Sequence, residues 1–339
     1  MRQLTFKGPG QLDWEEVAAP PLTGEGDAIV RPVAVATCDL DTWVIAGRVP
    51  LPGPFALGHE FVADVVEVAT GVGSAHAGQR VMVPFQISCG FCERCRQGLT
   101  ASCETAGPGA AYGMAPIARQ EWGGALSDLV RVPFADAMLV PLPPGVETAT
   151  FASVSDNIVD GWRSVAPGLD TNPESPVLIV GGAGDVALYA AAIAVALGSV
   201  RVDYVDTDQR RLRVAQAVGA NPIERAVDGS SLGRYPITVD HSGERTGLHC
   251  ALRSTEPEGI CTSTAIYFGA DMPLPMLEMY TRGVTFRTGR VNARTVMPAV
   301  VDLILEGRFQ PELITAATVP WEDAAEALAH LEAKTVLIR

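Results

Sequence analysis

Basic residues are scarce in this chain of 339 residues. Lys and Arg total 25 against 39 Asp and Glu, so the formal net charge at pH 7 is −14. A surface with that excess of negative charge repels phosphate backbones and anionic lipid headgroups. Nucleic acids and membrane surfaces are therefore not expected among the partners of this protein.

Targeting and membrane-spanning signals are also missing. The opening residues, MRQLTFKGPGQLDWEE, contain no basic stretch followed by an apolar run, which predicts a cytoplasmic protein. The most apolar window, residues 177–197, is broken by three glycines and Asp185, so it predicts a strand, a turn and a helix instead of a transmembrane span. The chain has no internal repeat, low-complexity segment or long run of like charges.

The chain length and the 47% of hydrophobic residues suit about two domains. From Ile29 to about Pro143 the pattern is one of short β-rich runs separated by Gly and Pro, such as 61–68 and 80–83, which predicts a mainly β domain. Beyond residue 157, strands at 177–180, 200–206, 237–240 and 259–266 alternate with helices, which predicts a doubly wound parallel sheet. We expect an α/β protein with domains at 1–156 and 157–291, and a C-terminal segment, 292–339, that returns to the first domain.

Four of the seven cysteines lie within one short segment. Cys89, Cys92, Cys95 and Cys103 form a C-x2-C-x2-C-x7-C array in CGFCERCRQGLTASC. Thiols in a reducing compartment stay unpaired unless a metal holds them. Four soft ligands suit a tetrahedral zinc ion with no open position, hence a structural site in a lobe at 89–103. Two disulfides or an iron–sulfur cluster are the alternatives.

A second set of possible metal ligands lies upstream. Cys38 precedes an extended stretch that leads to His59 and Glu60 in the sequence Gly-His-Glu. A single buried cysteine or histidine is ordinarily part of a core. A thiolate, an imidazole and a carboxylate together match the ligands of a catalytic zinc that keeps one position for substrate.

A glycine-rich turn joins the strand at 177–180 to the next helix. It reads Gly182, Ala183, Gly184, Asp185, Val186 and Ala187, a G-x-G-x-x-A pattern. Gly182 permits the tight turn, Gly184 lets a pyrophosphate approach the backbone, and Ala187 allows close helix packing. The following strand ends in Asp206, whose carboxylate can accept ribose hydroxyls and would repel a 2′-phosphate, so NAD is favoured over NADP.

These motifs occur in an order that resembles the zinc-containing medium-chain alcohol dehydrogenases: C-x-x-D at 38–41, GHE at 58–60, the four cysteines and the dinucleotide turn. The stretches GPGAAYGMAP and WGGALSDLVRVPFADAMLVPLP look most like the formaldehyde and threonine dehydrogenase branch. The resemblance implies a GroES-like catalytic domain, a Rossmann cofactor domain, one catalytic and one structural zinc, and a homodimer or homotetramer.

The resemblance also implies roles for particular residues. Cys38 and His59 would be zinc ligands, with Asp156 of SVSDNIVDGW as the third. Glu60 would be an exchanging ligand or a supporting carboxylate, and Asp41 would accept the other ring N–H of His59. Ordinary solvated acids are the alternative for these two. The resemblance further places Arg211 by the adenosine ribose and Lys334 near the pyrophosphate, although both also fit solvated surface charges.

Three positions depart from the family pattern. Leu40 stands where a Ser or Thr usually passes the alcohol proton towards solvent, and a leucine cannot relay a proton. Trp43 replaces a histidine of that relay, and Asp160 replaces a threonine beside the nicotinamide. Thr42 or a water molecule are the substitutes for the relay that we consider.

The resemblance implies an enzyme that moves a hydride between a small alcohol and NAD, with an aldehyde or ketone as the product. Leu40 motivates an alternative, a zinc-containing, NAD(P)H-dependent reductase of an imine or activated alkene. A third hypothesis is a dinucleotide-binding protein without catalysis, against which the complete set of Cys38, His59 and Asp156 argues.

Overall fold

A computed structural model describes residues 1–49, 51–115, 121–182, 184–269 and 271–339. The described chain divides into two compact units. The first comprises 1–159, 292–301 and 315–339, and the second comprises 160–291 and 302–314. Within the described ranges, no helix combines the length and the apolar character that crossing a membrane requires.

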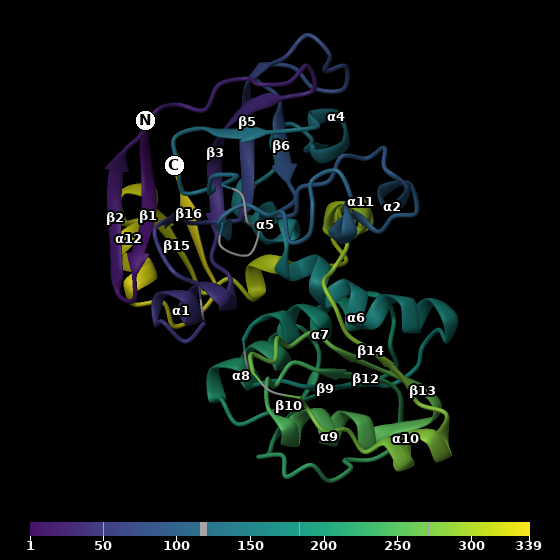
Figure 1. Ribbon diagram of the computed structural model, residues 1–339. Coiled ribbons are helices and arrows are strands. Elements are labelled where there is room, and N and C mark those ends of the chain that lie inside the picture. Colours follow the sequence, from purple (N-terminus) through teal and green to yellow (C-terminus); the bar gives the residue numbers. More distant parts are fainter. Residues whose placement is uncertain (50, 116–120, 183, 270) are drawn as a thin grey trace. The chain divides into compact units, whose positions relative to one another are not determined.

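The first unit is built on a sheet with the strand order β15-β16-β3-β5-β6-β8, in which β7 also pairs with β3 (Figure 1). All its pairs are antiparallel except β15 with β16. A smaller sheet has the order β2-β1-β4. The strands are β1 (Arg2–Gly8), β2 (Gln11–Glu16), β3 (Ala28–Ala36), β4 (Phe55–Ala56), β5 (Glu60–Val68), β6 (Arg80–Val83), β7 (Val130–Val132), β8 (Val140–Pro141), β15 (Ala317–Pro320) and β16 (Thr335–Ile338).

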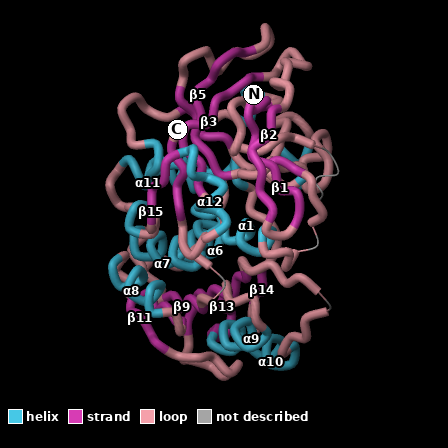
Figure 2. Tube along the Cα trace, turned by 90° about the vertical axis from the view of Figure 1, so that its left-hand side faces the viewer, coloured by secondary structure: helices cyan, strands magenta, loops and turns pink. Residues whose placement is uncertain are grey.

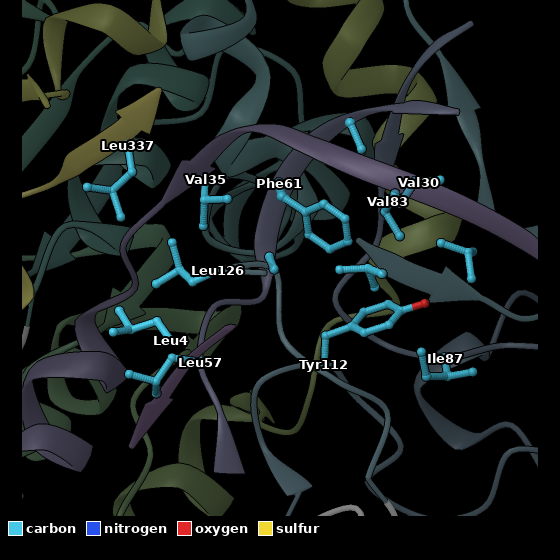
Figure 3. Close-up of a cluster of buried hydrophobic side chains, with 14 of the residues drawn as sticks. Leu4, Val30, Val35, Leu57, Phe61, Val83, Ile87, Tyr112, Leu126 and Leu337 are labelled. Carbon is cyan, nitrogen blue, oxygen red and sulfur yellow. The ribbon is translucent and has the colours of Figure 1, made fainter. Parts of the chain in front are cut away.

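The core of the first unit packs against one face of this large sheet (Figure 3). Val35 of β3 is paired with Phe61 of β5 on one side and with Leu337 of β16 on the other. All three side chains are buried in the same hydrophobic cluster, and the ring of Tyr112 meets Phe61 edge-on at 5.6 Å between centroids. Residues that alternate with these three therefore lie on the opposite face of the sheet.

Helices of the first unit are short. They are α1 (Asp39–Ile45), α2 (Glu93–Arg96), α4 (Ala135–Met138), α5 (Thr148–Phe151) and α12 (Ala324–Ala329), with 3-10 turns η1 (Thr100–Ser102), η2 (Ala152–Ser155) and η4 (Trp321–Asp323). Two longer helices, α6 (Asn157–Thr171) and α11 (Ala293–Leu305), contain two of the four positions at which the chain passes from one unit to the other.

The second unit is a parallel sheet with the order β11-β10-β9-β12-β13-β14. In both views α7 lies on one face of this sheet, and α9 and α10 lie on the other (Figures 1 and 2). The strands are β9 (Val177–Val180), β10 (Val202–Asp206), β11 (Asn221–Glu224), β12 (Tyr235–Asp240), β13 (Thr255–Ser263) and β14 (Thr285–Arg287); the helices are α7 (Val186–Ala196), α8 (Gln209–Ala217), α9 (Arg245–Ser254) and α10 (Met276–Arg282), with the turn η3 (Pro311–Leu313). This doubly wound layering confirms the predicted α/β fold class.

The predicted C-terminal segment, 292–339, is divided between the units because α11 crosses their boundary after Val301. The residues that follow α11 pack within the second unit. Phe309 meets the ring of Tyr189 edge-on at 6.3 Å, and Arg308 Nη2 donates to the Ala196 carbonyl at 2.9 Å. Residues 302–314 are therefore held by α7, and only the flanking stretches belong to the first unit.

Two neighbouring valines on β5 test the assignment of the sheet faces. Val65 is 2% exposed and belongs to the core, whereas Val66 is 38% exposed. We expect Val65→Ala to lower the free energy of unfolding by about 2 kcal/mol, because two buried methyl groups are removed and a cavity is left. The matched control, Val66→Ala, should change it by about 0.5 kcal/mol or less. Urea unfolding of both variants measures the difference, and equal losses would contradict the assignment.

Candidate functional site

Three polar segments meet at one end of the large sheet. Ala36, the last residue of β3, is paired with Glu60 on β5 and with Val336 on β16. Cys38 lies two residues beyond Ala36, His59 directly precedes Glu60, and Lys334 lies two residues before Val336. Strand register therefore gathers residues that are far apart in the sequence.

The alternation of side chains decides which face these residues occupy. Val35, Phe61 and Leu337 face the core, so Ala36, Glu60 and Val336 face the other way. Glu60, the member of the cluster that lies on a strand, is therefore on the side of the sheet opposite the apolar core.

Asp156 is brought to the same place by the turn η2. Ser155 Oγ donates to the Phe61 carbonyl at 3.1 Å and accepts the Phe61 N–H at 3.2 Å. These two bonds tie the segment to the start of β5, so the next residue, Asp156, lies beside His59. Both side chains are buried.

The distances among the three predicted ligands suit a tetrahedral zinc ion. Cys38 Sγ lies 3.7 Å from Asp156 Oδ2, and His59 Nε2 lies 3.4 Å from the same oxygen. Zinc bonds of about 2.0 to 2.3 Å at tetrahedral angles place the ligand atoms about 3.3 to 3.8 Å apart. Ligand atoms of Cys38, His59, Glu60 and Asp156 all lie within 4.8 Å of one another. The structure therefore brings these four predicted residues together.

His59 supplies an independent test of the fit. Its ring is buried, and within the described part of the chain neither ring nitrogen makes a hydrogen bond. Burying an imidazole without hydrogen bonds is costly, and a metal on Nε2 would satisfy that nitrogen. Asp41 Oδ1 lies 3.9 Å from Nδ1, while Asp41 Oδ2 accepts the Cys38 N–H at 2.8 Å. The predicted hydrogen bond from Nδ1 to Asp41 thus stays a prediction.

The electrostatics of the cluster favour a cation. Burial raises the pKa of Glu60 to about 8, and it also raises the pKa values of Asp41 and of the Cys38 thiol. Burial opposes the charged form of His59, but the carboxylates of Asp156 and Asp41 outweigh it and raise the His59 pKa to about 9. The cluster therefore retains protons that a bound divalent ion would displace.

Lys334 belongs to this cluster, and the glycine-rich turn belongs to the other unit. Its ammonium donates to Glu60 Oε2 at 2.8 Å, to Glu60 Oε1 at 3.1 Å and to Asn157 Oδ1 at 2.7 Å, as well as to the Thr37 carbonyl. The side chain is wholly buried. The solvated surface charge considered for Lys334 from the sequence is therefore wrong, and its predicted position near the pyrophosphate stays a prediction.

Asn157 is a site residue that the sequence reasoning missed. Its Nδ2 donates to Cys38 Sγ and to Asp156 Oδ2, both at 3.3 Å. Its position directly after the predicted third ligand was the available signal. A metal ligand commonly has a hydrogen-bonding neighbour that orients it.

The three departures from the family pattern lie as follows. Leu40 packs against the core of the first unit, and the Thr42 hydroxyl donates to the Asp39 carbonyl at 2.7 Å. Asp160 forms an ion pair with Arg163. Trp43 is partly exposed on α1. The Thr42 hydroxyl proton is donated to a backbone carbonyl, so the structure does not show Thr42 in the role of the proton relay.

The four clustered cysteines form a second candidate metal site. Their sulfur atoms lie within 4.8 Å of one another, with Cys89 Sγ 4.0 Å from Cys95 Sγ. Backbone N–H groups of Cys92 and Ala106 donate to Cys89 Sγ and Cys103 Sγ at 3.3 and 3.4 Å, which is the arrangement that stabilises thiolates. All four cysteines are free in the structure, and the spacing of their sulfur atoms fits a closed four-thiolate site.

The cysteine lobe also holds the beginning of α11. The Ala101 N–H donates to Asn292 Oδ1 at 3.0 Å, and Thr295 Oγ1 donates to the Gly98 carbonyl at 2.8 Å. Arg294 Nε donates to the Ala137 carbonyl at 2.7 Å. These bonds explain why residues 292–301 belong to the first unit.

The glycine-rich turn of the second unit connects β9 to α7. Gly182 has a φ of 129°, which an L-residue adopts only under strain. A Cβ on Gly181 would lie 2.5 Å from the Tyr204 hydroxyl and 2.6 Å from Asp206 Oδ2, so the turn is closely packed on β10. Asp185 precedes the first residue of α7, and its Oδ1 accepts from Arg210 Nη2 at 2.8 Å. The first turn of a helix offers backbone N–H groups to a phosphate, which fits the predicted roles of Gly182, Gly184, Asp185, Val186 and Ala187.

Asp206 lies at the end of β10, as predicted, and Arg211 reaches its carboxylate from α8. Arg211 Nε donates to Asp206 Oδ2 at 2.8 Å and Arg211 Nη2 to Oδ1 at 3.0 Å. Burial alone would raise the pKa of Asp206, but Arg211 and the Asp208 N–H outweigh burial and lower it. The sequence reasoning did not foresee this bidentate ion pair.

The sequence and the fold of this chain were compared with those of known proteins. Residues 24–144 match the alcohol dehydrogenase GroES-like domain. A probable zinc-binding alcohol dehydrogenase of Mycobacterium tuberculosis is 29% identical over 99% of this chain and 86% of its own length. A glutathione-independent formaldehyde dehydrogenase of Pseudomonas aeruginosa is 33% identical over 64% of this chain and 57% of its own length. The structure of an alcohol dehydrogenase from Thermus sp. ATN1 superposes with a TM-score of 0.90 at 28% identity, covering 100% of this chain and 99% of that one.

The named relatives are zinc-type alcohol or formaldehyde dehydrogenases, and the similarity to the first of them covers nearly the whole of this chain. Residues 24–144 therefore belong to the alcohol dehydrogenase GroES-like domain family, and the chain as a whole is similar to zinc-type alcohol dehydrogenases.

Proposed function

We propose that this protein is a zinc-dependent, NAD-linked oxidoreductase that moves a hydride between a small alcohol and its aldehyde or ketone. The observation that carries the proposal is the buried set of Cys38, His59 and Asp156, with ligand spacings suited to tetrahedral zinc. Three protein ligands leave a fourth position for a substrate oxygen, which distinguishes this site from the closed cysteine lobe.

A bound zinc ion would supply Lewis acidity that lowers the pKa of a coordinated hydroxyl, and a bound NAD would accept the hydride. The protein's part is to hold the three ligands at fixed spacing. Asn157 orients the thiolate and the carboxylate through its Nδ2, and Ser155 anchors the Asp156 segment to β5. A thiolate and a carboxylate neutralise the charge of Zn²⁺, so the open position stays electrophilic without a net local charge from these ligands.

The second unit supports the choice of a nicotinamide dinucleotide. Gly182 and the start of α7 offer a pyrophosphate site, and Asp206 offers a carboxylate for ribose hydroxyls. Arg211 already donates to both oxygens of Asp206, so the ribose hydroxyls would have to donate to the same carboxylate alongside Arg211. A 2′-phosphate would meet a carboxylate whose charge Arg211 partly offsets, so we propose a preference for NAD and not an absolute exclusion of NADP.

The alternative motivated by Leu40, a reductase of an imine or activated alkene, is not favoured by the relatives, which are named as alcohol and formaldehyde dehydrogenases. The absent relay hydroxyl is compatible with alcohol oxidation if water carries the proton.

The direct test is turnover on a panel of short primary and secondary alcohols with NAD, followed by NADH absorbance, against cyclic imines and enones with NADH. We expect alcohol oxidation by the wild type. His59→Ala should lower kcat/KM by about 100-fold or more, because the Lewis acid is lost with its ligand. The matched control His76→Ala replaces an exposed histidine and should keep the wild-type rate. Turnover on imines or enones alone would favour the alternative.

Zinc content per chain checks the two metal sites separately. Protein prepared without added metal should contain two zinc ions, and His59→Ala and Cys103→Ala should each contain one, because each removes a ligand of a different site. Cys250→Ala, which replaces a buried cysteine of the second unit, should keep both. One zinc in both the wild type and His59→Ala would leave the proposed catalytic site without its metal and would contradict the proposal.

Cofactor choice is tested at Asp206 by fluorescence titration with NADH and NADPH, which needs no substrate. Asp206→Ala removes the acceptor for the ribose hydroxyls and releases Arg211, so we expect NADH binding to weaken about tenfold or more and NADPH binding to tighten. Glu224→Ala removes an exposed carboxylate on the neighbouring strand and is the control. Unchanged affinities for both cofactors in Asp206→Ala would mean that Asp206 does not contact the ribose.

A further inference from the structure

Glu60 has two possible partners inside the candidate catalytic site. Its carboxylate lies close enough to Cys38, His59 and Asp156 to be a fourth metal ligand. Both of its oxygens instead face the ammonium of Lys334, at 2.8 and 3.1 Å. Because the Glu60 and Lys334 side chains are both 0% exposed, water cannot solvate either charge, and each needs a partner of opposite charge within the cluster.

We propose that Lys334 is a positioning residue that holds the Glu60 carboxylate out of the zinc coordination shell and so keeps the fourth position open for substrate. The inference rests on the proposed function, since it requires zinc at Cys38, His59 and Asp156. The Lys334 ammonium and a bound zinc ion would compete for the Glu60 carboxylate. In the structure the carboxylate is bound to Lys334.

The remaining contacts of Lys334 fix its ammonium in this place. It donates to the Thr37 carbonyl, just beyond the end of β3, and to Asn157 Oδ1 at 2.7 Å, at the start of α6. Register holds Lys334 as well, because the Thr335 N–H donates to Thr37 Oγ1 at 3.0 Å and the Thr37 N–H to the Thr335 carbonyl at 2.9 Å. An ammonium has three hydrogens, and these three acceptor groups account for all of them.

Lys334 also orients Asn157. An ammonium only donates, so the oxygen of the Asn157 amide must face Lys334. The amide NH₂ group then faces Cys38 Sγ and Asp156 Oδ2, each at 3.3 Å. One buried ammonium thereby directs the Glu60 carboxylate away from the metal and directs a hydrogen-bond donor towards two of the ligands.

The test uses the full chain with both zinc sites exchanged for Co²⁺, and azide as a probe of the open position. Azide should bind the open position of the Cys38, His59 and Asp156 site and so change the visible absorption of the wild type. The four-thiolate site has no free position, so it should not contribute to this change. In Lys334→Met the unpaired Glu60 carboxylate should bind the metal, so azide should bind about tenfold or more weakly. The double variant Lys334→Met/Glu60→Gln should regain the response to azide.

A second readout separates this role from a merely structural one. With Glu60 as an added ligand, Lys334→Met should release its catalytic zinc to a chelator more slowly than the wild type. General loosening of the site would make release faster. An unchanged azide affinity in Lys334→Met, or a wild type that does not respond to azide, would overturn the proposal.

Glu60→Gln alone tests whether Glu60 is a zinc ligand, even if Lys334→Met does not fold. It should bind azide within about twofold of the wild type, because a carboxylate that is not a ligand can be replaced without opening a position. Tighter azide binding or faster zinc release in Glu60→Gln would show that Glu60 already ligates zinc. One zinc per wild-type chain would instead overturn the proposed function, an outcome that zinc analysis detects before cobalt exchange.

Discussion

The pairing of β3 with both β5 and β16 is the constraint on which the candidate site depends. This register places the ends of three strands at one end of the sheet, where Cys38, His59, Glu60 and Lys334 meet. Most of the chain separates Lys334 from Glu60 in the sequence. Alternation along the strands then puts Val35, Phe61 and Leu337 on the core face and Glu60 on the other. The core and the site therefore cannot vary independently, because a shift of one residue in any of the three strands would exchange the two faces.

Burial of several acidic side chains in one place lowers the stability of the folded protein. Asp41, Glu60 and Asp156 are all buried, and Lys334 is the buried ammonium among them in the part of the chain that the structure describes. A buried ion pair adds little to stability by itself, since desolvation offsets the attraction. Its value here is positional: Lys334 fixes where one carboxylate points and which way the amide of Asn157 faces.

Much of this could be predicted from the sequence because the signals are local. Spacing within 89–103 predicts a four-sulfur site, and alternating strands and helices predict the doubly wound unit, with the strand at 177–180 found where expected. The ligand set of Cys38, His59 and Asp156 needed the order of motifs as well as composition. What sequence could not supply were partnerships across long separations. Lys334 carries no motif, and its place beside Glu60 follows from sheet register; Arg211 is close to Asp206 in sequence, but its bidentate geometry depends on how α8 packs.

The position of β16 within the first sheet has a consequence for the order in which the molecule can be assembled during synthesis. β16 lies between β15 and β3, yet it follows the whole of the second unit in the chain. A ribosome therefore completes the residues of the parallel sheet before it supplies the strand that covers β3 and delivers Lys334. Until then residues 34–36 of β3 have no strand on the side that β16 later covers, and the acids beside them lack their ammonium. All residues of the second unit are therefore synthesised before the residue that completes the charged cluster of the first unit.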